Sequence, residues 1–484
     1  MNRRQFVQQS TLTGAAFIVS KYGLGQQNEF ANVRVAKSNR HFSSPAVEKL
    51  IADFQKNVAN KEMGWLFGNC FPNTLDTTVD FTMVNGRPDT YVITGDIDAM
   101  WLRDSSAQVW PYLPLMKEDK NLQMLVKGVI NRQVQCILLD PYANAFFKDA
   151  SRQSEWQKTD ITNWKPGIHE RKWEIDSLCY PIRLAFAYWE ATGDTSIFTP
   201  DWKEAMRLVL QTFKEQQRQD GKGPYTFQRT TSWATDGVPL AGYGYPARPN
   251  GMICSMFRPS DDATIFPYLI PSNWFAVFAL DWLHQMARAA GEEPISRQAF
   301  EMGTSLAKVL WEYGNVLTAK FDSIWAYETN GLGSCNLMDD ANVPSLLSIP
   351  YLGDTLLTNT KQTIWQNTRR YVLSESNPFF FKGTAGEGIG SPHTLLDMIW
   401  PIGIAIRGLT STDEVEIKHC LDMLQTTHAG TGFMHESFHK DDPSNFTRKW
   451  FAWANSLFGE FAWKVYRRKP HLLNMKVGHM PGGK

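Results

Sequence analysis

The sequence has no excess of charge of either sign and no long apolar run beyond its N-terminus. Its 484 residues include 49 Lys and Arg against 49 Asp and Glu, so the formal net charge is zero. A nucleic-acid surface needs a basic patch or stripe, and a membrane-spanning helix needs about 20 apolar residues. We therefore expect neither a nucleic-acid partner nor an integral membrane protein.

Closely spaced cysteines and nucleotide-binding motifs are also missing. The six cysteines are scattered without a Cys-x-x-Cys pair, which argues against a zinc site and a compact disulfide framework. The glycine-rich segment 384–393 is not a P-loop or a dinucleotide-binding motif, because no Lys-Ser or Lys-Thr follows it and no strand pattern precedes it. The sequence contains no cofactor motif.

The N-terminus has the features of a targeting segment. The pair Arg3-Arg4 opens a pattern that resembles a bacterial twin-arginine signal, and a modest apolar run over residues 12–19 follows. The run is too short to span a bilayer. We expect residues 1–30 to be an export signal, or otherwise a disordered leader, and the protein to be exported to the periplasm.

Apolar residues recur at helical spacing through the remainder of the chain, which predicts an all-α protein. Candidate helices cover 173–189, 273–290, 300–313, 394–409, 411–430 and 448–466. Ser272 is a candidate N-cap, Ser411 and Glu414 fit a capping box, and Pro401 should kink or break its helix.

Residues 31–484 show no linker and no strict repeat, which favours one domain and weakly disfavours a solenoid. A closed double ring of helix pairs fits such a chain, although helical periodicity alone does not separate that toroid from a solenoid. Two long polar loops, 229–260 and 377–392, interrupt the helices, and loops of that length are usually functional.

The densest cluster of charged residues lies within residues 94–104. The segment contains three carboxylates and one guanidinium next to an indole, from Asp96, Asp98, Trp101, Arg103 and Asp104. Lone charges are costly to bury, so such a cluster is rarely plain core. A sugar needs this kind of surface, because its hydroxyls need fixed acceptors and donors and its C–H face packs on an aromatic ring. The alternative is an exposed loop with an Arg–Asp pair.

Two further clusters are acidic. Glu174 and Asp176 stand at the head of a candidate helix, where the alternative explanation is that they complement the helix dipole. Arg258 precedes the adjacent carboxylates Asp261 and Asp262 and can separate their pKa values, so that one stays protonated while the other ionises. The alternative there is an Asp-rich turn before a helix.

Two clusters lie in candidate loops. Segment 384–393 carries Glu387 and His393 among glycines that allow a close approach of the backbone to a ligand, or it is a flexible surface connection. Segment 432–439 carries His435, Glu436 and His439, but it looks like a loop between two helices, whereas a zinc-binding His-Glu-x-x-His lies on a helix, so we expect no metal. Two opposed carboxyl groups are what glycoside hydrolysis requires.

Four stretches together resemble glycoside hydrolase family 125, the exo-acting α-mannosidases: TGDIDAMWLRDSSAQ, WEIDSLCYP, RPSDDATIFPYLIPSN and GFMHESF. The resemblance spans about residues 40–470 and keeps the order of the motifs. It implies an (α/α)6 barrel that removes terminal α-1,6-linked mannose from non-reducing ends, with inversion and without a metal or other cofactor. It also implies a mannose-containing glycan as the partner, and we expect a monomer.

The resemblance assigns roles to residues of this chain. Asp261 or Asp262 would be the general acid, with Asp262 favoured, and Glu436 the general base. Arg103 and Asp104 would hold the hydroxyls of the bound mannose, and Trp101 would shape their pocket. Further expected substrate-binding residues are Asp96, Asp98, Arg258, Glu387, His393 and His435.

Three other functions stay open at this point. A polysaccharide lyase or a sugar epimerase can use the same toroid, and a lyase would use Tyr, His or Lys as its base. A non-catalytic glycan-binding protein would keep the aromatic wall but would need no opposed acid and base.

Overall fold

The computed structural model describes residues 30–353 and 359–480. The export signal predicted for residues 1–30 therefore lies outside the described residues, apart from Phe30. Helices predominate among the described residues, and small two- and three-stranded sheets connect them. The prediction of an all-α protein is correct for the frame and wrong for the loops, several of which pair as short strands.

Five helices lie inside the molecule, and most of their residues are buried. They are α5 (Leu102–Val109), α7 (Ile175–Thr192), α9 (Ile270–Ala289), α13 (Pro401–Leu409) and α15 (Ala452–Arg468). Helix α7 packs against α5 and α9, and α15 packs against α5 and α13. Because each of these helices has neighbours on more than one side, it needs more than a single apolar stripe.

Other helices pack outside this set. They are α6 (Lys120–Leu139), α8 (Pro200–Gln216), α10 (Glu293–Tyr313) and α14 (Glu414–Thr426). Helix α6 contacts α7 and α8, α10 contacts α8 and α9, and α14 contacts α13. Helix α10 buries Ile295, Ala299, Leu306 and Leu310 along one stripe and leaves Phe300 exposed, as expected for an amphipathic helix.

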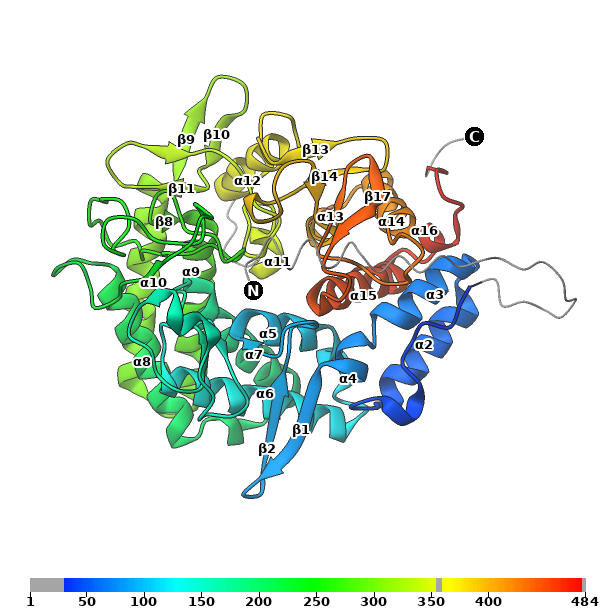
Figure 1. Cartoon of the computed structure of the whole chain (residues 1–484), viewed down its shortest axis with the longest axis horizontal. Helices are drawn as coiled ribbons and strands as arrows, with labels where there is room; N and C mark the ends of the chain where they lie inside the picture. The colour runs from blue at the N-terminus through cyan, green and yellow to red at the C-terminus, as the bar shows by residue number, and fades with distance from the viewer. Residues whose placement is uncertain (1–29, 354–358, 481–484) are drawn as a thin grey trace, which may run out of the picture.

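The helices follow one another around a ring in chain order (Figure 1). The ring brings the two ends of the described chain together, because α3 (Lys61–Cys70) packs against both α2 (Pro45–Asn57) and α15. The remaining α-helices are α4 (Asn73–Thr77), α11 (Ile349–Leu352), α12 (Asn359–Val372) and α16 (His471–Asn474). Short 3-10 helices cover Lys37–Asn39, Trp110–Leu115, Glu155–Lys158, Thr195–Ile197 and Pro392–Thr394.

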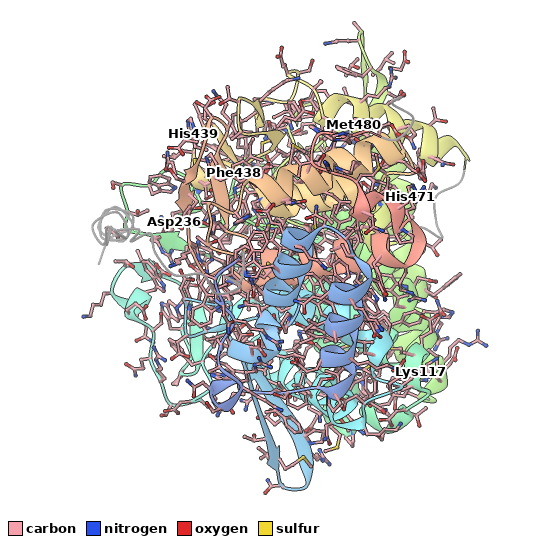
Figure 2. All side chains as sticks on the ribbon, turned by 90° about the vertical axis from the view of Figure 1, so that its right-hand side faces the viewer. Lys117, Asp236, Phe438, His439, His471 and Met480 are labelled. Atoms are coloured by element: carbon pink, nitrogen blue, oxygen red, sulfur yellow. The ribbon has the colours of Figure 1, made fainter. Side chains whose placement is uncertain are left out.

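Four sheets have two antiparallel strands each. They pair β1 (Val79–Val84) with β2 (Arg87–Val92), β5 (Asp160–Ile161) with β7 (Gln228–Arg229), β9 (Asn315–Thr318) with β10 (Asp322–Trp325), and β13 (Phe380–Lys382) with β14 (Glu387–Ile389). The β1–β2 hairpin extends beyond the helices in both Figure 1 and Figure 2.

Three sheets have three strands, and each contains a strand that leads into an inner helix. Their orders are β3 (Met100–Trp101), β4 (Ala145–Phe146), β6 (Ile168–Glu170); β12 (Cys335–Asn336), β11 (Glu328–Thr329), β8 (Tyr268–Leu269); and β15 (Met398–Ile399), β16 (Ser437–His439), β17 (Asp442–Thr447). Strand β3 runs directly into α5, β8 into α9, and β15 ends one residue before α13. These pairings fix the point at which each of the three helices begins.

Several predicted elements are confirmed and several boundaries are wrong. Helices α7, α9 and α10 occupy the predicted segments, but α9 begins at Ile270, so Ser272 is not its N-cap. Pro401 is the first residue of α13 rather than a kink, because the first turn of a helix tolerates a missing N–H. The cap of α14 is Asp413, not Ser411, and that helix ends at Thr426.

Apolar side chains form one large connected core that extends from Ala46 to Leu473. A small second cluster of Ala99, Trp101 and Ala145 lies around strands β3 and β4. No helix within residues 30–353 and 359–480 combines the length and the apolar character needed to cross a membrane.

Candidate active site

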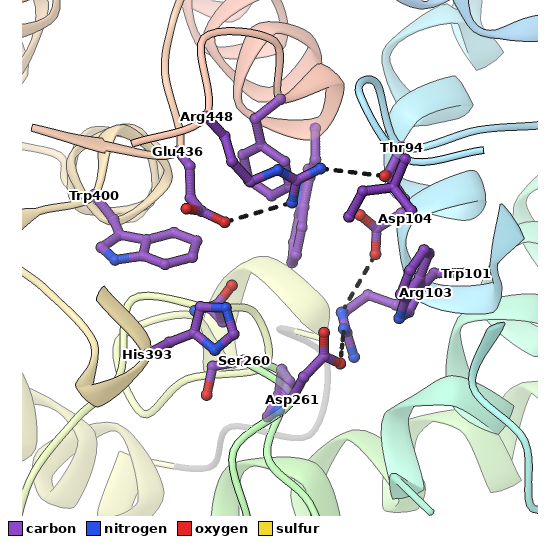
Figure 3. A pocket seen from close by; sticks show the side chains of 15 residues that line it. Thr94, Trp101, Arg103, Asp104, Ser260, Asp261, His393, Trp400, Glu436 and Arg448 are labelled. Atoms are coloured by element: carbon purple, nitrogen blue, oxygen red, sulfur yellow. Dashed lines mark hydrogen bonds and ion pairs between the residues drawn. The ribbon is translucent and has the colours of Figure 1, made fainter. Parts of the chain in front are cut away.

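A pocket with an empty volume of about 390 Å³, partly open to solvent, lies among the segments that precede the inner helices. Its walls bring together charged, polar and aromatic side chains from distant parts of the chain (Figure 3). The lining residues are Thr94, Ile97, Trp101, Arg103, Asp104, Pro259, Ser260, Asp261, Asn342, His393, Trp400, Glu436, Arg448, Phe451 and Trp453.

One wall is built by the first turn of α5. Arg103 and Asp104 begin one residue after strand β3, so the pairing of β3 with β4 fixes their position. The Arg103 guanidinium is 3% exposed and lies 3.6 Å from the Asp104 carboxylate. Burial raises the pKa of Asp104 to about 6, although the charge of Arg103 works in the opposite direction. This wall offers a fixed donor and an acceptor to a polar ligand.

The turn at residues 258–262 presents one of its two aspartates to the pocket. The Arg258 N–H donates to the Asp262 carbonyl over 2.7 Å, which closes the turn, and Asp261 adopts a left-handed φ of 66°. Asp261 lines the pocket and has a side chain 23% exposed, whereas Asp262 is fully buried and does not line it. The preference for Asp262 as the acid therefore lacks support in the geometry.

The two aspartates have different partners. Asp261 Oδ1 lies 3.3 Å from both Arg103 Nη2 and Asn144 Nδ2. Asp262 Oδ1 accepts a hydrogen bond of 2.9 Å from the Thr235 hydroxyl and lies 3.4 Å from His393 Nδ1. Asp261 is thus part of the polar wall, and Asp262 holds the turn in place from behind.

Glu436 stands on the opposite side of the pocket from Asp261, and Figure 3 shows the two carboxyl groups pointing into the space between them. It directly precedes strand β16, whose pairing with β15 and β17 fixes its position. Arg448 Nη1 lies 3.4 Å from Glu436 Oε1, and Arg448 Nη2 lies 2.6 Å from Asp96 Oδ1. Asp96 therefore acts on the pocket through Arg448, since it does not line it.

Aromatic side chains line much of the remaining pocket wall. Trp400 packs edge-on against Phe451 with ring centroids 6.0 Å apart, and its indole N–H donates to the Thr394 hydroxyl over 2.8 Å. Trp101 and Trp453 are also buried pocket residues. The Trp101 indole N–H finds no hydrogen-bond acceptor among the residues that the structure describes. Aromatic faces with a spare donor suit the C–H faces and hydroxyls of a sugar.

Besides Asp96, four predicted substrate-binding residues do not line the pocket. Asp98 has a side chain 69% exposed and pairs with Arg152 at 2.8 Å, and buried Arg258 pairs with Glu328 at 2.7 Å. Glu387 hydrogen-bonds to His419 and Arg407, which lowers its pKa, and is not a pocket residue. His435 stacks on Phe446, and burial lowers its pKa to about 3, so it is neutral at pH 7. Each of these four residues is near a pocket residue in the sequence, but its side chain contacts residues outside the pocket.

Five pocket residues lie outside the polar clusters that the sequence analysis singled out: Asn342, Trp400, Arg448, Phe451 and Trp453. Residues 448–453 combine an arginine with three aromatics, and residues 94–104 likewise place an arginine near an aromatic, but the helical periodicity of residues 448–466 concealed the signal. Helix α15 begins only at Ala452, so Arg448 precedes it. Asn342 had no sequence signal that we can identify. Within residues 30–353 and 359–480, no group of three or more His, Cys, Asp or Glu side chains is arranged to hold a metal ion.

Sequence comparison matches residues 60–463 to a family described as metal-independent alpha-mannosidase (GH125). The chain is similar to the meiotically up-regulated gene 157 protein of Schizosaccharomyces pombe. The two are 41% identical over 457 residues, which cover 91% of this chain and 89% of the yeast protein.

Structure comparison gives a match to a metal-independent α-mannosidase of Streptococcus pneumoniae, solved in a non-productive complex with α-1,6-mannobiose. The two are 39% identical, with a TM-score of 0.83 over 89% of this chain and all of the other. The solved structure of a glycosidase variant matches with a TM-score of 0.50 and 11% identity over 86% of this chain and 97% of its own. At that identity the second likeness concerns the fold alone.

Proposed function

The chain belongs to glycoside hydrolase family 125, the metal-independent α-mannosidases, and from this premise we propose that it removes terminal α-1,6-linked mannose from non-reducing ends with inversion. As a glycoside hydrolase it is neither a lyase nor an epimerase, and it is not a purely glycan-binding protein. The substrate would be a mannose-containing glycan. Support for the linkage comes from the pneumococcal relative, which was crystallised with α-1,6-mannobiose.

The observation that carries this proposal is the placement of Asp261 and Glu436 on opposite sides of one pocket. In our proposal Glu436 deprotonates a water molecule, which attacks the anomeric carbon from one face of the sugar. Asp261 protonates the glycosidic oxygen on the other face as the C–O bond breaks. An inverting pair stands about 6.5–9.5 Å apart, because the water must fit beneath the sugar.

Removal of single terminal residues is supported by the Arg103 side of the pocket. Arg103 and Asp104 would hold the hydroxyls of the terminal mannose, and Trp101 would offer both an aromatic face and its indole N–H. The Arg103 guanidinium is almost fully buried, so charged side chains close this wall of the pocket. A sugar bound against the wall has no room for a further residue on that side, which favours exo cleavage.

The finer architecture and the setting of the protein are also proposals. The ring order of the helices supports an (α/α)6 barrel, and the single large core supports one catalytic domain over residues 31–484. The pair Arg3-Arg4 supports export to a bacterial periplasm. We further propose that the enzyme acts as a monomer.

The experiment is hydrolysis of α-1,6-mannobiose followed by NMR in the first minutes of the reaction. We expect β-mannose as the first product, and the same rate in the presence of EDTA. Initial release of α-mannose would contradict inversion. A longer α-1,6-mannan oligosaccharide should lose one residue at a time, and release of internal fragments would contradict exo cleavage.

A further inference from the structure

Behind Asp261 the pocket wall contains one arginine surrounded by carboxyl groups. Arg103 Nη1 lies 2.7 Å from Glu174 Oε2 and 3.1 Å from Asp176 Oδ2. Its other contacts are Asp261 at 3.3 Å and Asp104 at 3.6 Å. Glu174 and Asp176 lie at the start of α7, but neither serves as a side-chain cap of that helix.

The charge of this cluster does not balance. Four carboxylates around a single guanidinium would carry a net charge of −3 in a buried place, where unpaired charge is strongly disfavoured. A further cation, Lys172, lies 2.9 Å from the Asp261 carbonyl oxygen but already pairs with Asp236 and Glu170. The cluster therefore retains at least one proton.

Glu174 is the carboxyl best placed to hold that proton. Its Oε2 accepts hydrogen bonds from Arg103 and, over 2.8 Å, from the Ser177 hydroxyl. Its Oε1 is buried and accepts no hydrogen bond from any described residue. Burial raises the pKa of Glu174 despite the nearby arginine, and Asp261 is close enough to accept a hydrogen bond from a protonated Glu174.

Asp261 has the opposite tendency. Burial disfavours its ionised form, but the charges of Arg103 and Lys172 and a hydrogen bond with Glu174 together outweigh burial and lower its pKa, with a smaller contribution from His393. Alone, Asp261 would therefore be a carboxylate at neutral pH and could not act as an acid. Two coupled carboxyls that share one proton provide a route around this difficulty.

We propose that Glu174 is a positioning residue that stores the proton which Asp261 delivers to the leaving group. Glu174 transfers the shared proton to Asp261, and Asp261 passes this proton to the glycosidic oxygen, which takes the electron pair of the breaking C–O bond. The attacking water loses a proton to Glu436, and solvent restores the proton of Glu174 after the products leave. The inference rests on the proposed role of Asp261 as the acid.

The test compares two leaving groups in Glu174→Gln. Glutamine keeps the shape and can donate a hydrogen bond to Asp261, but it supplies no proton. We expect kcat for α-1,6-mannobiose to fall by about 10²-fold or more with little change in KM, the loss typical of impaired general acid catalysis. Hydrolysis of 2,4-dinitrophenyl α-mannoside, whose leaving group needs no proton, should fall by less than about 10-fold. The alkaline limb of the kcat/KM profile should move to lower pH, because the variant lacks the carboxyl whose raised pKa lets the pair keep its shared proton.

The matched control is Asp176→Asn, which removes one carboxylate from the same guanidinium. We expect it to change the rates for the two substrates by the same factor. Equal losses for both substrates in Glu174→Gln, or no loss for either, would overturn the inference. Should Glu174→Gln not fold, Glu174→Asp retains a carboxyl but withdraws it from Asp261, and equal losses for both substrates there would overturn the inference as well.

Asp261→Asn separates this inference from the proposed function. If mannobiose hydrolysis slows in Asp261→Asn but the rates are unchanged in Glu174→Gln, Glu174 does not store the proton, and Asp261 remains the general acid. An unchanged rate of mannobiose hydrolysis in Asp261→Asn would instead exclude Asp261 as the general acid.

Discussion

The two sides of the pocket differ in how many carboxyl groups surround a single arginine. On one side, Arg448 forms ion pairs with two carboxylates, Asp96 and Glu436. On the other side, Arg103 lies within 3.6 Å of four carboxyl groups, which are Asp104 in α5, Glu174 and Asp176 at the start of α7, and Asp261 in the turn before β8 and α9. A site that must take up a proton and a site that must give one up need such a difference, because excess buried carboxylate retains protons.

Loss of Glu436 should have the largest effect. In Glu436→Gln no group remains to deprotonate the attacking water, so we expect kcat to fall by about 10³–10⁴-fold. The loss should be the same for mannobiose and for 2,4-dinitrophenyl α-mannoside, since water attacks in both reactions. Calorimetry should show mannobiose binding within a few-fold of the parent enzyme, and residual turnover near the parent rate would exclude Glu436 as the base.

A second comparison separates the neighbouring aspartates. Asp261→Asn should lower kcat on mannobiose by about 10²–10³-fold and spare the dinitrophenyl substrate. Asp262→Asn should change kcat much less, because Asp262 does not reach the pocket, and should instead destabilise the turn by roughly 1–3 kcal/mol. The reverse pattern in the kinetics and thermal melts would return the role of acid to Asp262.

Replacing Arg103 tests the charge imbalance around it, because the imbalance should change the free energy of unfolding. Arg103→Ala leaves four carboxyl groups, three of them buried, without their cation, and we expect a loss of about 3–5 kcal/mol at pH 7. Without the arginine, the carboxyl pKa values in the folded state rise above those in the unfolded state. The loss should therefore shrink as the pH falls and the carboxyls become protonated. Urea unfolding at pH 7 and pH 4 measures it, and a loss independent of pH would contradict the assignment.

Asp104 should destabilise the folded protein at neutral pH. Its pKa is raised to about 6, so the folded state binds its proton more tightly, and the stability it contributes is lost as the pH rises through 6. Asp104→Asn should accordingly stabilise the protein by about 1–3 kcal/mol at pH 7 and by nothing below about pH 4. Mannobiose binding should weaken at the same time. A destabilised Asp104→Asn protein at pH 7 would contradict this prediction.

Replacing Asp98 should have the smallest effect on activity and stability, so it serves as a control for the variants of the pocket residues. Its side chain is exposed and pairs with Arg152 outside the pocket. Asp98→Asn should change kcat/KM for mannobiose less than about twofold and stability by less than about 0.5 kcal/mol. A larger kinetic effect would place Asp98 in the binding of the glycan.

The sequence predicted the helical frame well because inner and outer helices both leave apolar periodicity. The sequence also revealed the densest polar segment, because Arg103 and Asp104 are neighbours in the chain. Short strands such as β3 and β15 were missed because two residues show no periodicity.

The choice between Asp261 and Asp262 could not be made from the sequence. The left-handed φ of Asp261, together with the hydrogen bond that closes its turn, decides which side chain faces the pocket. Sequence analysis likewise placed Glu174 and Asp176 at a helix start without indicating that both pair with Arg103, 71 and 73 residues away. Such partners become visible only when the chain is folded.

The most direct test of the opposed acid and base is a crystal structure of Glu436→Gln with α-1,6-mannobiose bound across the point of cleavage. We expect the Asp261 carboxyl within hydrogen-bond reach of the glycosidic oxygen, and a water molecule held by residue 436 beneath the anomeric carbon. The two side chains should stand about 6.5–9.5 Å apart. A separation near 5 Å with no water between them, or a glycosidic oxygen in contact with Asp262, would contradict the account.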